Sequence, residues 1–366
     1  MQESRLLDLF CELVRIESPS FHEAPMAARC ADELRGLGFE VSFDDSAERV
    51  GSDTGNLVAR LPGTRTGHVV FSAHMDTVQP CAGIEPVVVD GVVRSAGDTI
   101  LSADDKAGVA AIFEGVRSAV ESGSPRPDVT VLLTTCEEQH LLGSSALADG
   151  LLPAGAPCYV LDADGAPGTI ITGAPCHWSL NATFSGRAAH AGVCPEEGVS
   201  AIAMAAAAVS SMPLGRLDEA TTANVGFIEG GGATNVVPDT CALAGECRSL
   251  YAERAEAQKA AMTEALEAAA ARFGGAVSIE WTKSYDAVLF DEEDELVQAI
   301  VRASRAAGLE PRFHRSGGGS DANVLAARGV DEDVGGLDVP VDDAGVVDDL
   351  EGAARLVEAL IAEGAQ

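Results

Sequence analysis

The chain has 366 residues, of which 46% are hydrophobic, enough for two domains with full-sized cores. It carries 57 acidic residues against 24 Lys and Arg, a formal net charge of −33. Such an acidic surface repels phosphate backbones and anionic lipids, so the composition argues against nucleic-acid and membrane-surface binding.

The sequence shows no features of an exported or membrane-spanning protein. The N-terminus reads as an amphipathic helix with early acidic residues, not as a basic segment followed by an apolar core. The most apolar run, residues 201–212, is too short to span a bilayer. Nine cysteines without a CxxC pair are typical of reduced thiols. We therefore expect a cytoplasmic protein.

The first 173 residues alternate between helices and short apolar strands. Helices are predicted over the first residues, with Leu7, Phe10 and Leu13 on one face, and over residues 23–37 and 106–120. Strands are predicted over residues 39–43, 56–61, 69–73 and 129–134. Continuous apolar strands that alternate with helices predict an α/β fold, a mostly parallel sheet with helices on both faces.

The pattern changes near residue 174. Strands are predicted over residues 177–184, 223–229, 240–248 and 276–283, and helices over residues 199–212 and 252–273. This β-α-β-β-α-β order is the ferredoxin-like motif. The sequence therefore predicts an inserted α+β lid or dimerisation domain at residues 174–285. The catalytic domain would comprise residues 1–173 and 286–366, with helices over residues 293–307 and 350–362.

Four clusters of titratable residues each follow a short apolar segment that is predicted to end as a strand, where the sites of α/β sheets usually lie. The four clusters are His74 with Asp76, Asp104 with Asp105, Glu137 with Glu138, and Asp162 with Asp164. His74 and Asp76 are two residues apart, so they face the same way on an extended segment. A carboxylate beside a histidine ligand fixes its tautomer and raises its basicity.

Each cluster alone also has an ordinary structural explanation. His74 could be a buried structural histidine, and Asp105 could cap a helix N-terminus, which is the preferred prediction for Asp105. Glu137 and Glu138 could be a solvated loop pair, and Asp162 could belong to a turn. Four such clusters in order, each at the carboxyl end of a strand, indicate a zinc or hard-cation site.

Eight segments, in order along nearly the whole chain, resemble the peptidase T-like (tripeptidase-like) branch of the co-catalytic zinc metallopeptidases. That family also includes aminoacylases, succinyl-diaminopimelate desuccinylases and glutamate carboxypeptidases. The matching segments are HMDTV, ILSADDKAGVAAI, EEQHLLGS, LDADG, GRAAHAGVCPEEGVSAI, TNVVPD, ECRSL and RSGGGSDANV. By that resemblance, His74, Asp104 and Asp162 would hold one Zn²⁺. Asp104 would bridge to a second Zn²⁺ that is also held by Glu138.

The resemblance also implies three catalytic roles. Asp76 would orient the histidine ligand. Glu137 would deprotonate the water between the metals and later protonate the leaving amine. His190 would reach a neighbouring site, in a homodimer formed through the lid, and stabilise the oxyanion.

Four further residues resemble substrate-binding positions. Asn235 and Arg248 match substrate contacts, and the fork of an arginine suits a carboxylate terminus. Gly318 and Gly319 belong to a glycine loop whose backbone N–H groups can cradle a carboxylate. A flexible loop without a ligand is the alternative explanation for that segment.

One metal ligand of the family pattern is missing. In relatives a last histidine after the glycine loop completes the second zinc site, but VGGLDVPVDDAGVVDDL contains none, and the alignment places Val339 there. Asp338 or Asp342 could substitute and favour Mn²⁺, Co²⁺ or Mg²⁺ over Zn²⁺. The second site could instead be lost, with or without the activity. His140, beside the glutamates, is a further candidate ligand.

The leading prediction is a metal-dependent hydrolase of an amide bond in a small peptide or an N-acyl amino acid, of tripeptidase or aminopeptidase type. Its partner would be that small substrate, with no nucleic acid and no membrane. The alternative is a repurposed or non-catalytic homologue with one metal or none, such as a protein of a biosynthetic pathway.

Overall fold

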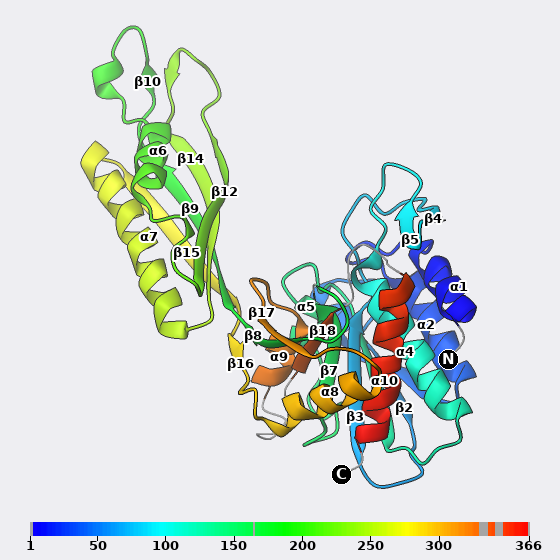
Figure 1. The fold of residues 1–366 in the computed structure, drawn as a ribbon. Coiled ribbons are helices and arrows are strands. Elements are labelled where there is room, and N and C mark those ends of the chain that lie inside the picture. Colours follow the sequence, from blue (N-terminus) through cyan, green and yellow to red (C-terminus); the bar gives the residue numbers. More distant parts are fainter. Residues whose placement is uncertain (1–2, 164, 329–335, 341–346, 365–366) are drawn as a thin grey trace. The chain divides into compact units, whose positions relative to one another are not determined.

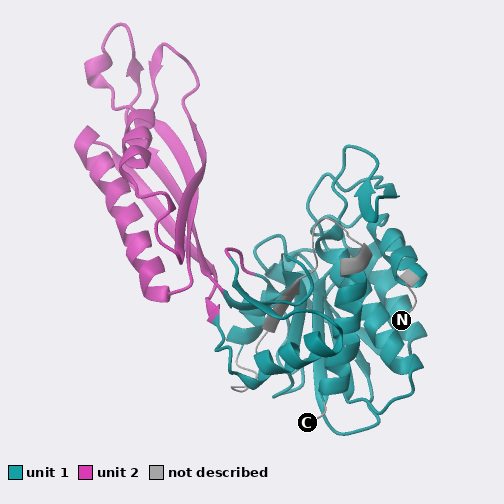
Figure 2. Cartoon of the chain, in the orientation of Figure 1, with its two compact units in different colours: residues 1–173, 289–316, 320–366 teal, residues 174–288, 317–319 magenta. Residues whose placement is uncertain are grey.

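The computed structural model describes residues 3–163, 165–328, 336–340 and 347–364. The chain forms two compact units (Figure 2). Unit 1 comprises residues 1–173, 289–316 and 320–366, and unit 2 comprises residues 174–288 and 317–319. No helix in the described part of the chain combines the length and the apolarity needed to cross a bilayer.

Unit 1 is built on a six-stranded sheet with the strand order β1-β2-β6-β3-β7-β18 (Figure 1). Its strands are β1 (Glu40–Phe43), β2 (Leu57–Leu61), β3 (His68–His74), β6 (Asp128–Thr134), β7 (Cys158–Ala163) and β18 (Gly336–Pro340). Only β2 runs against the others, so the predicted mostly parallel sheet is confirmed. The central strands β3 and β6 are buried along almost their whole length, which explains their continuous apolar sequences.

Helices cover both faces of this sheet, as predicted. One face carries α1 (Glu3–Val14), α2 (Ala24–Gly36), α4 (Ala103–Glu121), α8 (Glu295–Ala306) and α10 (Val347–Glu363). The other face carries α9 (Asp321–Ala327), whose Ala322 and Leu325 pack on Val70 and Val160. The main core lies on the first face, where inward residues of β3 and β6 meet α4.

Shorter elements complete unit 1 and the segments that connect it to unit 2. They are α3 (Ser46–Val50), α5 (Leu142–Ser145), the hairpin of β4 (Pro86–Val89) and β5 (Val92–Ser95), and the sheet of β16 (Val288–Leu289), β8 (Thr169–Ala174) and β17 (Arg312–Arg315). The sequence analysis did not predict the β4–β5 hairpin. It joins the segment after His74 to the segment before Asp104, so both of its ends lead to predicted metal ligands.

Unit 2 is an antiparallel sheet with two helices packed on it. The strands are β11 (Gly215–Arg216), β12 (Thr221–Gly230), β14 (Thr240–Ser249), β9 (Cys176–Ser185) and β15 (Ala276–Tyr285), in that spatial order. The helices α6 (Ala201–Ser211) and α7 (Ala252–Phe273) pack on inward residues such as Leu180, Phe184 and Leu243. The main elements follow the predicted β-α-β-β-α-β order, and alternate residues of β9 face the helices.

We predict that Gly115→Ala destabilises unit 1. A Cβ at Gly115, in the middle of α4, would lie 2.6 Å from Val357 Cβ and 2.7 Å from the Ala354 carbonyl oxygen of α10. Overpacking costs roughly 1–3 kcal/mol, more than the ~1 kcal/mol that alanine gains over glycine in a helix. Denaturant unfolding should therefore show a loss of about 1–2 kcal/mol.

The matched control is Gly36→Ala, at the end of α2, where a Cβ meets no atom within 4 Å. This variant should be neutral or slightly stabilising. Equal effects of the two substitutions would contradict the close packing of α4 on α10.

Candidate metal and catalytic site

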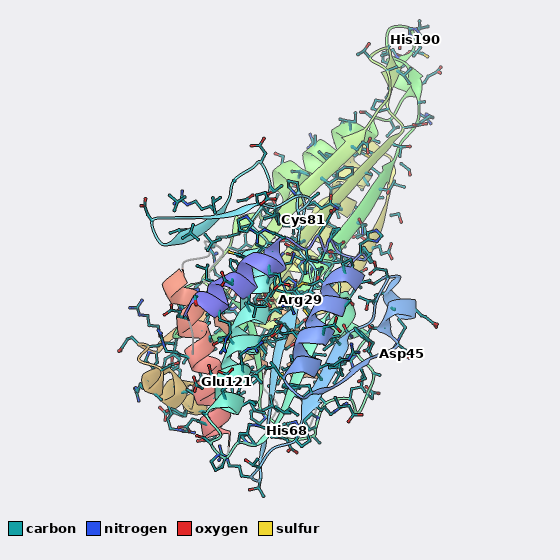
Figure 3. The ribbon with its side chains drawn as sticks, turned by 90° about the vertical axis from the view of Figure 1, so that its right-hand side faces the viewer. Arg29, Asp45, His68, Cys81, Glu121 and His190 are labelled. Atoms are coloured by element: carbon teal, nitrogen blue, oxygen red, sulfur yellow. The ribbon has the colours of Figure 1, made fainter. Side chains whose placement is uncertain are left out.

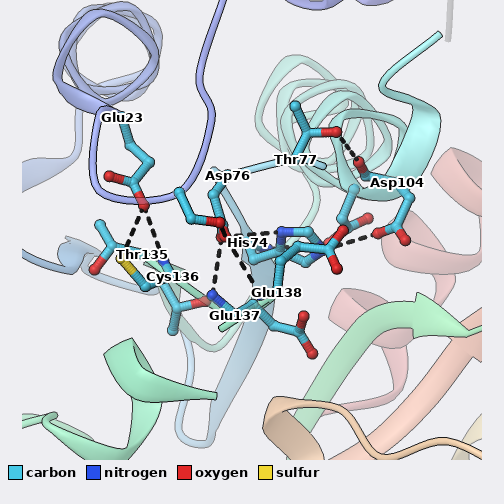
Figure 4. Close-up of polar contacts among 12 residues, drawn as sticks. Glu23, His74, Asp76, Thr77, Asp104, Thr135, Cys136, Glu137 and Glu138 are labelled. Atoms are coloured by element: carbon cyan, nitrogen blue, oxygen red, sulfur yellow. Dashed lines mark hydrogen bonds and ion pairs between the residues drawn. The ribbon is translucent and has the colours of Figure 1, made fainter. Parts of the chain in front are cut away.

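Four predicted metal ligands lie near the carboxyl ends of the parallel strands. His74 ends β3 and Asp162 is the last residue but one of β7. Asp104 lies at the start of α4, well after β5 ends at Ser95, so the prediction that it ends a strand was wrong. The Nε2 atom of His74 lies 2.8 Å from Asp104 Oδ1 and 3.5 Å from Asp162 Oδ1. Ligand atoms of His74, Asp104 and Glu138 all lie within 4.8 Å of one another. The imidazole of His74 thus lies with the carboxylates of Asp104 and Glu138 (Figure 4), and Asp162 lies against the same imidazole.

Neighbouring carboxylates favour the protonated form of His74. Burial disfavours the imidazolium, but the carboxylates of Asp162, Asp104 and Asp76 outweigh burial and raise the pKa of His74 well above its ordinary value. The imidazolium thus neutralises carboxylates that face it from two sides. A divalent cation suits the same position, because buried carboxylates need a positive partner.

The donor set fits a divalent transition metal. Imidazole nitrogen and carboxylate oxygen are the ligands that zinc, manganese and cobalt share, whereas thiolates are absent from the two donor groupings found among the described residues. The second grouping comprises His74, Asp105 and Asp162. The residues therefore fit a metal centre, and His74, Asp104, Asp162 and Glu138 are side chains that could hold it.

Asp105 braces the site backbone. Its Oδ1 accepts the N–H of Gly108 at 3.1 Å, which is the helix-capping contact predicted for this residue. Its Oδ2 accepts the N–H of His74 at 3.1 Å and so ties the end of β3 to the start of α4. A Cβ at Gly108 would lie 2.2 Å from Asp105 Oδ1, so only glycine fits there.

Asp76 and Glu137, the predicted orienting acid and general base, both lie beside this cluster. Asp76 is fully buried, and its Oδ1 lies 3.4 Å from His74 Nδ1. Burial opposes its ionisation, but contacts with His74 and Ser20 lower the pKa of Asp76. For Glu137, burial and the charge of Asp162 raise the pKa well above its ordinary value.

The turn after β6 carries Glu137 and Glu138 in an unusual backbone conformation. Cys136, His140 and Leu141 have φ values of +51°, +63° and +61°, a left-handed region that costs non-glycine residues of order 1–3 kcal/mol. Cys136 is buried and lies in this turn, two residues after β6 ends at Thr134.

The missing last ligand maps to β18. This strand runs parallel to β7, with Asp338 opposite Val160 and Pro340 opposite Ala163. The backbone of Val339 therefore lies beside the part of β7 that carries Asp162. Asp342 and Asp164 lie outside the described residues.

His140 follows the two glutamates but is not gathered with the metal ligands. It is exposed, and neither donor grouping in the described ranges includes it.

Arg248, a predicted substrate-binding residue, forms an ion pair with Glu246 in unit 2. Arg248 lies opposite His177 across the β14–β9 pair, at the end of the unit where β9 begins. Glu246 accepts from Arg248 at Nε (3.1 Å) and Nη2 (3.0 Å), and it also lies 2.9 Å from His177 Nε2. The contact with His177, together with that of Arg248, lowers the pKa of Glu246 to about 2. Arg248 is thus held in one orientation by a permanently charged carboxylate.

The glycine loop packs against the same end of unit 2. A Cβ at Gly319 would lie 2.3 Å from the ring of Tyr285, so the loop approaches the ring closely. Tyr285 in turn stacks on His177 with ring centroids 5.5 Å apart. The structure therefore brings Gly318 and Gly319 to the neighbourhood of Arg248.

His190 and Asn235 lie elsewhere in unit 2. His190 belongs to β10 (Ala189–His190), which pairs with β13 (Val236–Val237), and the N–H of Ala191 donates to the Asn235 carbonyl oxygen at 3.0 Å. Figure 3 shows His190 at the tip of this unit. Because β9 alone has ten residues, the tip lies roughly 30 Å from its first residues. The structure thus separates His190 from Arg248.

Sequence reasoning missed four residues that support the site. Ser20 donates to Asp76 at 2.7 Å, and Glu23 and Asn56 accept from the turn after β6. Asp321, at the start of α9, is buried and accepts from Thr134. Only Asp321 lies in a segment that the analysis had singled out, since RSGGGSDANV includes it.

Comparisons with known proteins agree with this architecture. Residues 173–273 match a peptidase dimerisation domain, and residues 56–169 match peptidase family M28. The Bacillus subtilis protein YqjE is 42% identical over 331 residues, which are 90% of this chain and 89% of that protein. The crystal structure of aminopeptidase PepT from Bacillus cereus is 40% identical with a TM-score of 0.90, and each chain is covered completely. A tripeptidase from Staphylococcus aureus is 34% identical with a TM-score of 0.93, again with complete coverage.

Similarity at this level over the full chain establishes the family, because both the sequence and the fold agree over complete chains. The chain belongs to the peptidase T-like branch of the metallopeptidases, and it is a metal-dependent hydrolase.

Proposed function

We propose that this enzyme cleaves amide bonds in short peptides, as a tripeptidase or aminopeptidase, at a metal centre held by His74, Asp104, Asp162 and Glu138. The observation that carries the proposal is the convergence of His74 Nε2 with two carboxylates at 2.8 and 3.5 Å. Relatives named aminopeptidase and tripeptidase support peptide over N-acyl substrates. The non-catalytic alternative finds no support in a site that keeps its base.

Zn²⁺ is the proposed metal at the first site, with Zn²⁺, Mn²⁺ or Co²⁺ at the second. When bound, such ions polarise the scissile carbonyl and lower the pKa of a water molecule. Loss of the last histidine should weaken the binding of the second ion, because one of its non-bridging ligands is gone.

Glu137 is the proposed general base. Its carboxylate would take a proton from the attacking water and then deliver it to the leaving amine. Burial and the charge of Asp162 raise the pKa of Glu137, and a more basic carboxylate is a better proton acceptor. Asp76 would hold the imidazole of His74 in orientation.

Arg248 is the proposed anchor of the substrate carboxylate. Its guanidinium fork is suited to bidentate recognition, and Glu246 keeps it in one orientation. The N–H groups of Gly318 and Gly319 would add donors for the same group.

We also propose that the active form is a homodimer, in the cytoplasm. A substrate bound to Arg248 cannot touch His190 of the same chain, because the two lie at opposite ends of unit 2. His190 and Asn235 would therefore act on the site of the partner chain. Among the described strands, the outer edge of β12 beyond Ala223 has no partner, and it carries Phe227 and Ile228 half-exposed. Nine cysteines without a CxxC pair favour a reducing compartment.

The first test is metal dependence combined with Glu137→Gln. The wild-type enzyme should lose tripeptide hydrolysis in a chelator and regain it with Zn²⁺, Mn²⁺ or Co²⁺. Glu137→Gln should bind the same amount of metal but turn over roughly 10²–10⁴-fold more slowly, because the base is lost. Metal analysis and a tripeptide assay measure both effects. Substantial activity in Glu137→Gln would remove Glu137 from the base role, and no turnover with any metal would end the peptidase proposal.

Restoring the missing ligand should repair the second site. We expect Val339→His to tighten binding of the second metal equivalent by at least about tenfold, since even residues that only orient ligands are worth that much. Isothermal titration calorimetry of the metal-free protein measures this change.

Val88→His, which adds an imidazole to the exposed face of β4, is the matched control for Val339→His and should leave the second equivalent unchanged. Asp338→His tests the neighbouring register. If neither Val339→His nor Asp338→His changes the affinity, the alignment of this segment is wrong.

The shared site can be tested by mixing two inactive variants. His190→Ala and Glu137→Ala should each be inactive as pure dimers. After subunit exchange, each mixed dimer would contain one complete site, so the mixture should regain about one quarter of wild-type activity. Exchange is followed with differently labelled chains. Confirmed exchange without recovery would contradict the contribution of His190 across the dimer.

A further inference from the structure

The turn that carries Glu137 and Glu138 is held by side chains along four consecutive residues (Figure 4). The backbone donors and their acceptors are Thr135 N to Asn56 Oδ1 (3.1 Å), Cys136 N to Glu23 Oε1 (2.9 Å), Glu137 N to Asp76 Oδ1 (2.9 Å) and Glu138 N to Asp76 Oδ2 (3.3 Å). All three acceptor side chains are buried and come from other parts of the chain. The position of this turn is therefore set by side chains and not by a strand ladder.

Glu23 is one of these acceptors, and no role in the site has been assigned to it above. Its side chain is completely buried, and its carboxylate accepts from Cys136 N, from Cys136 Sγ at 3.2 Å and from Ser52 Oγ at 2.7 Å. Glu23 precedes α2 but makes no side-chain cap there, and Asp53 Oδ1 accepts the N–H of Ala24. The carboxylate is thus used on the turn and not on its own helix.

The contact falls at the left-handed residue of the turn. Cys136 has a φ of +51°, and a non-glycine residue keeps such a conformation only where its surroundings fix it. Glu23 fixes the N–H of Cys136, and Asp76 fixes the N–H groups of the next two residues. Rotation at Cys136 would swing the Glu137 side chain, so the grip on Cys136 determines where the base points.

The other end of the turn is also constrained. Asn56 donates from Nδ2 to the Gly143 carbonyl oxygen at 2.8 Å while its Oδ1 accepts from Thr135. A Cβ at Gly143 would lie 1.9 Å from the Thr135 carbonyl oxygen, so the two ends of the turn touch. Glu23 therefore acts on a closed turn with little freedom to adjust elsewhere.

We infer that Glu23 is a positioning residue for catalysis: by accepting the backbone N–H and the thiol of Cys136, it holds the left-handed bend that aims the Glu137 carboxylate. In this role Glu23 provides an acceptor oxygen at a fixed distance from its own backbone. The turn requires this oxygen and not the negative charge. The inference rests on the proposed role of Glu137 as the general base.

Two conservative variants separate reach from charge. Glu23→Gln keeps an oxygen at the same distance, and its amide can pair with the Ser52 hydroxyl, so kcat should stay within a few-fold of wild type. Glu23→Asp keeps the charge but is one methylene shorter and cannot reach Cys136. Its kcat should fall on the order of 10²-fold, the effect of a misplacement of about 1 Å, with KM and metal content nearly unchanged.

The control is Glu114→Gln, at another completely buried glutamate, which pairs with Arg5 on α1 away from the turn. It should lower the melting temperature without changing kcat below the unfolding transition. All variants are assayed as full-length, metal-loaded protein with a tripeptide, and circular dichroism reports the folded fraction.

The outcomes distinguish the two proposals. Wild-type kcat in Glu23→Asp, or a Glu23→Gln variant as slow as Glu23→Asp, would overturn the positioning role. The same holds if kcat in Glu23→Asp falls only as far as the folded fraction does. If Glu137→Gln itself stays active, the base assignment fails whatever Glu23 does. An inactive Glu137→Gln with an unimpaired Glu23→Asp removes only the inference about Glu23.

Discussion

The structure depends on negative charge that is packed around a single imidazole at the edge of a parallel sheet. Asp76, Asp104 and Asp162 all face His74, and burial alone would oppose keeping so many carboxylates ionised. Such a cluster is stable only with a positive partner, which the imidazolium or a metal can provide. The surrounding elements, β3, β7 and the start of α4, hold these side chains close despite their mutual repulsion.

Most of the fold could be predicted because its signals are local. The apolar runs of β3 and β6 predict buried parallel strands, and the alternation in residues 177–184 predicts a sheet with one covered face, which β9 has. The β4–β5 hairpin was missed because its three consecutive valines remain partly exposed and lack the alternation of a half-buried strand. Several helix ends differ from the prediction by one to three residues, as in the helix predicted over residues 106–120, which spans Ala103–Glu121.

The site was predictable to the extent that its residues follow strands. His74 and Asp162 could be expected at one edge because parallel strands end there, whereas Asp104 starts α4. Glu23 and Asn56 could not, since their side chains reach the turn across the fold and their sequence neighbourhoods suggest only a helix start and a strand start. The separation of His190 from Arg248 has no local sequence signal; only the family resemblance implied that His190 reaches a neighbouring site.

The acidic cluster has a consequence for the stability of the molecule. Its ligands come from segments far apart in the chain, so an unfolded polypeptide scatters them and a divalent ion binds almost solely to the native form. Mass action then adds about 2.7 kcal/mol to the free energy of unfolding when the free ion exceeds its dissociation constant a hundredfold. With the proposed metal centre, removal of divalent ions would therefore lower the stability of the fold as well as the activity.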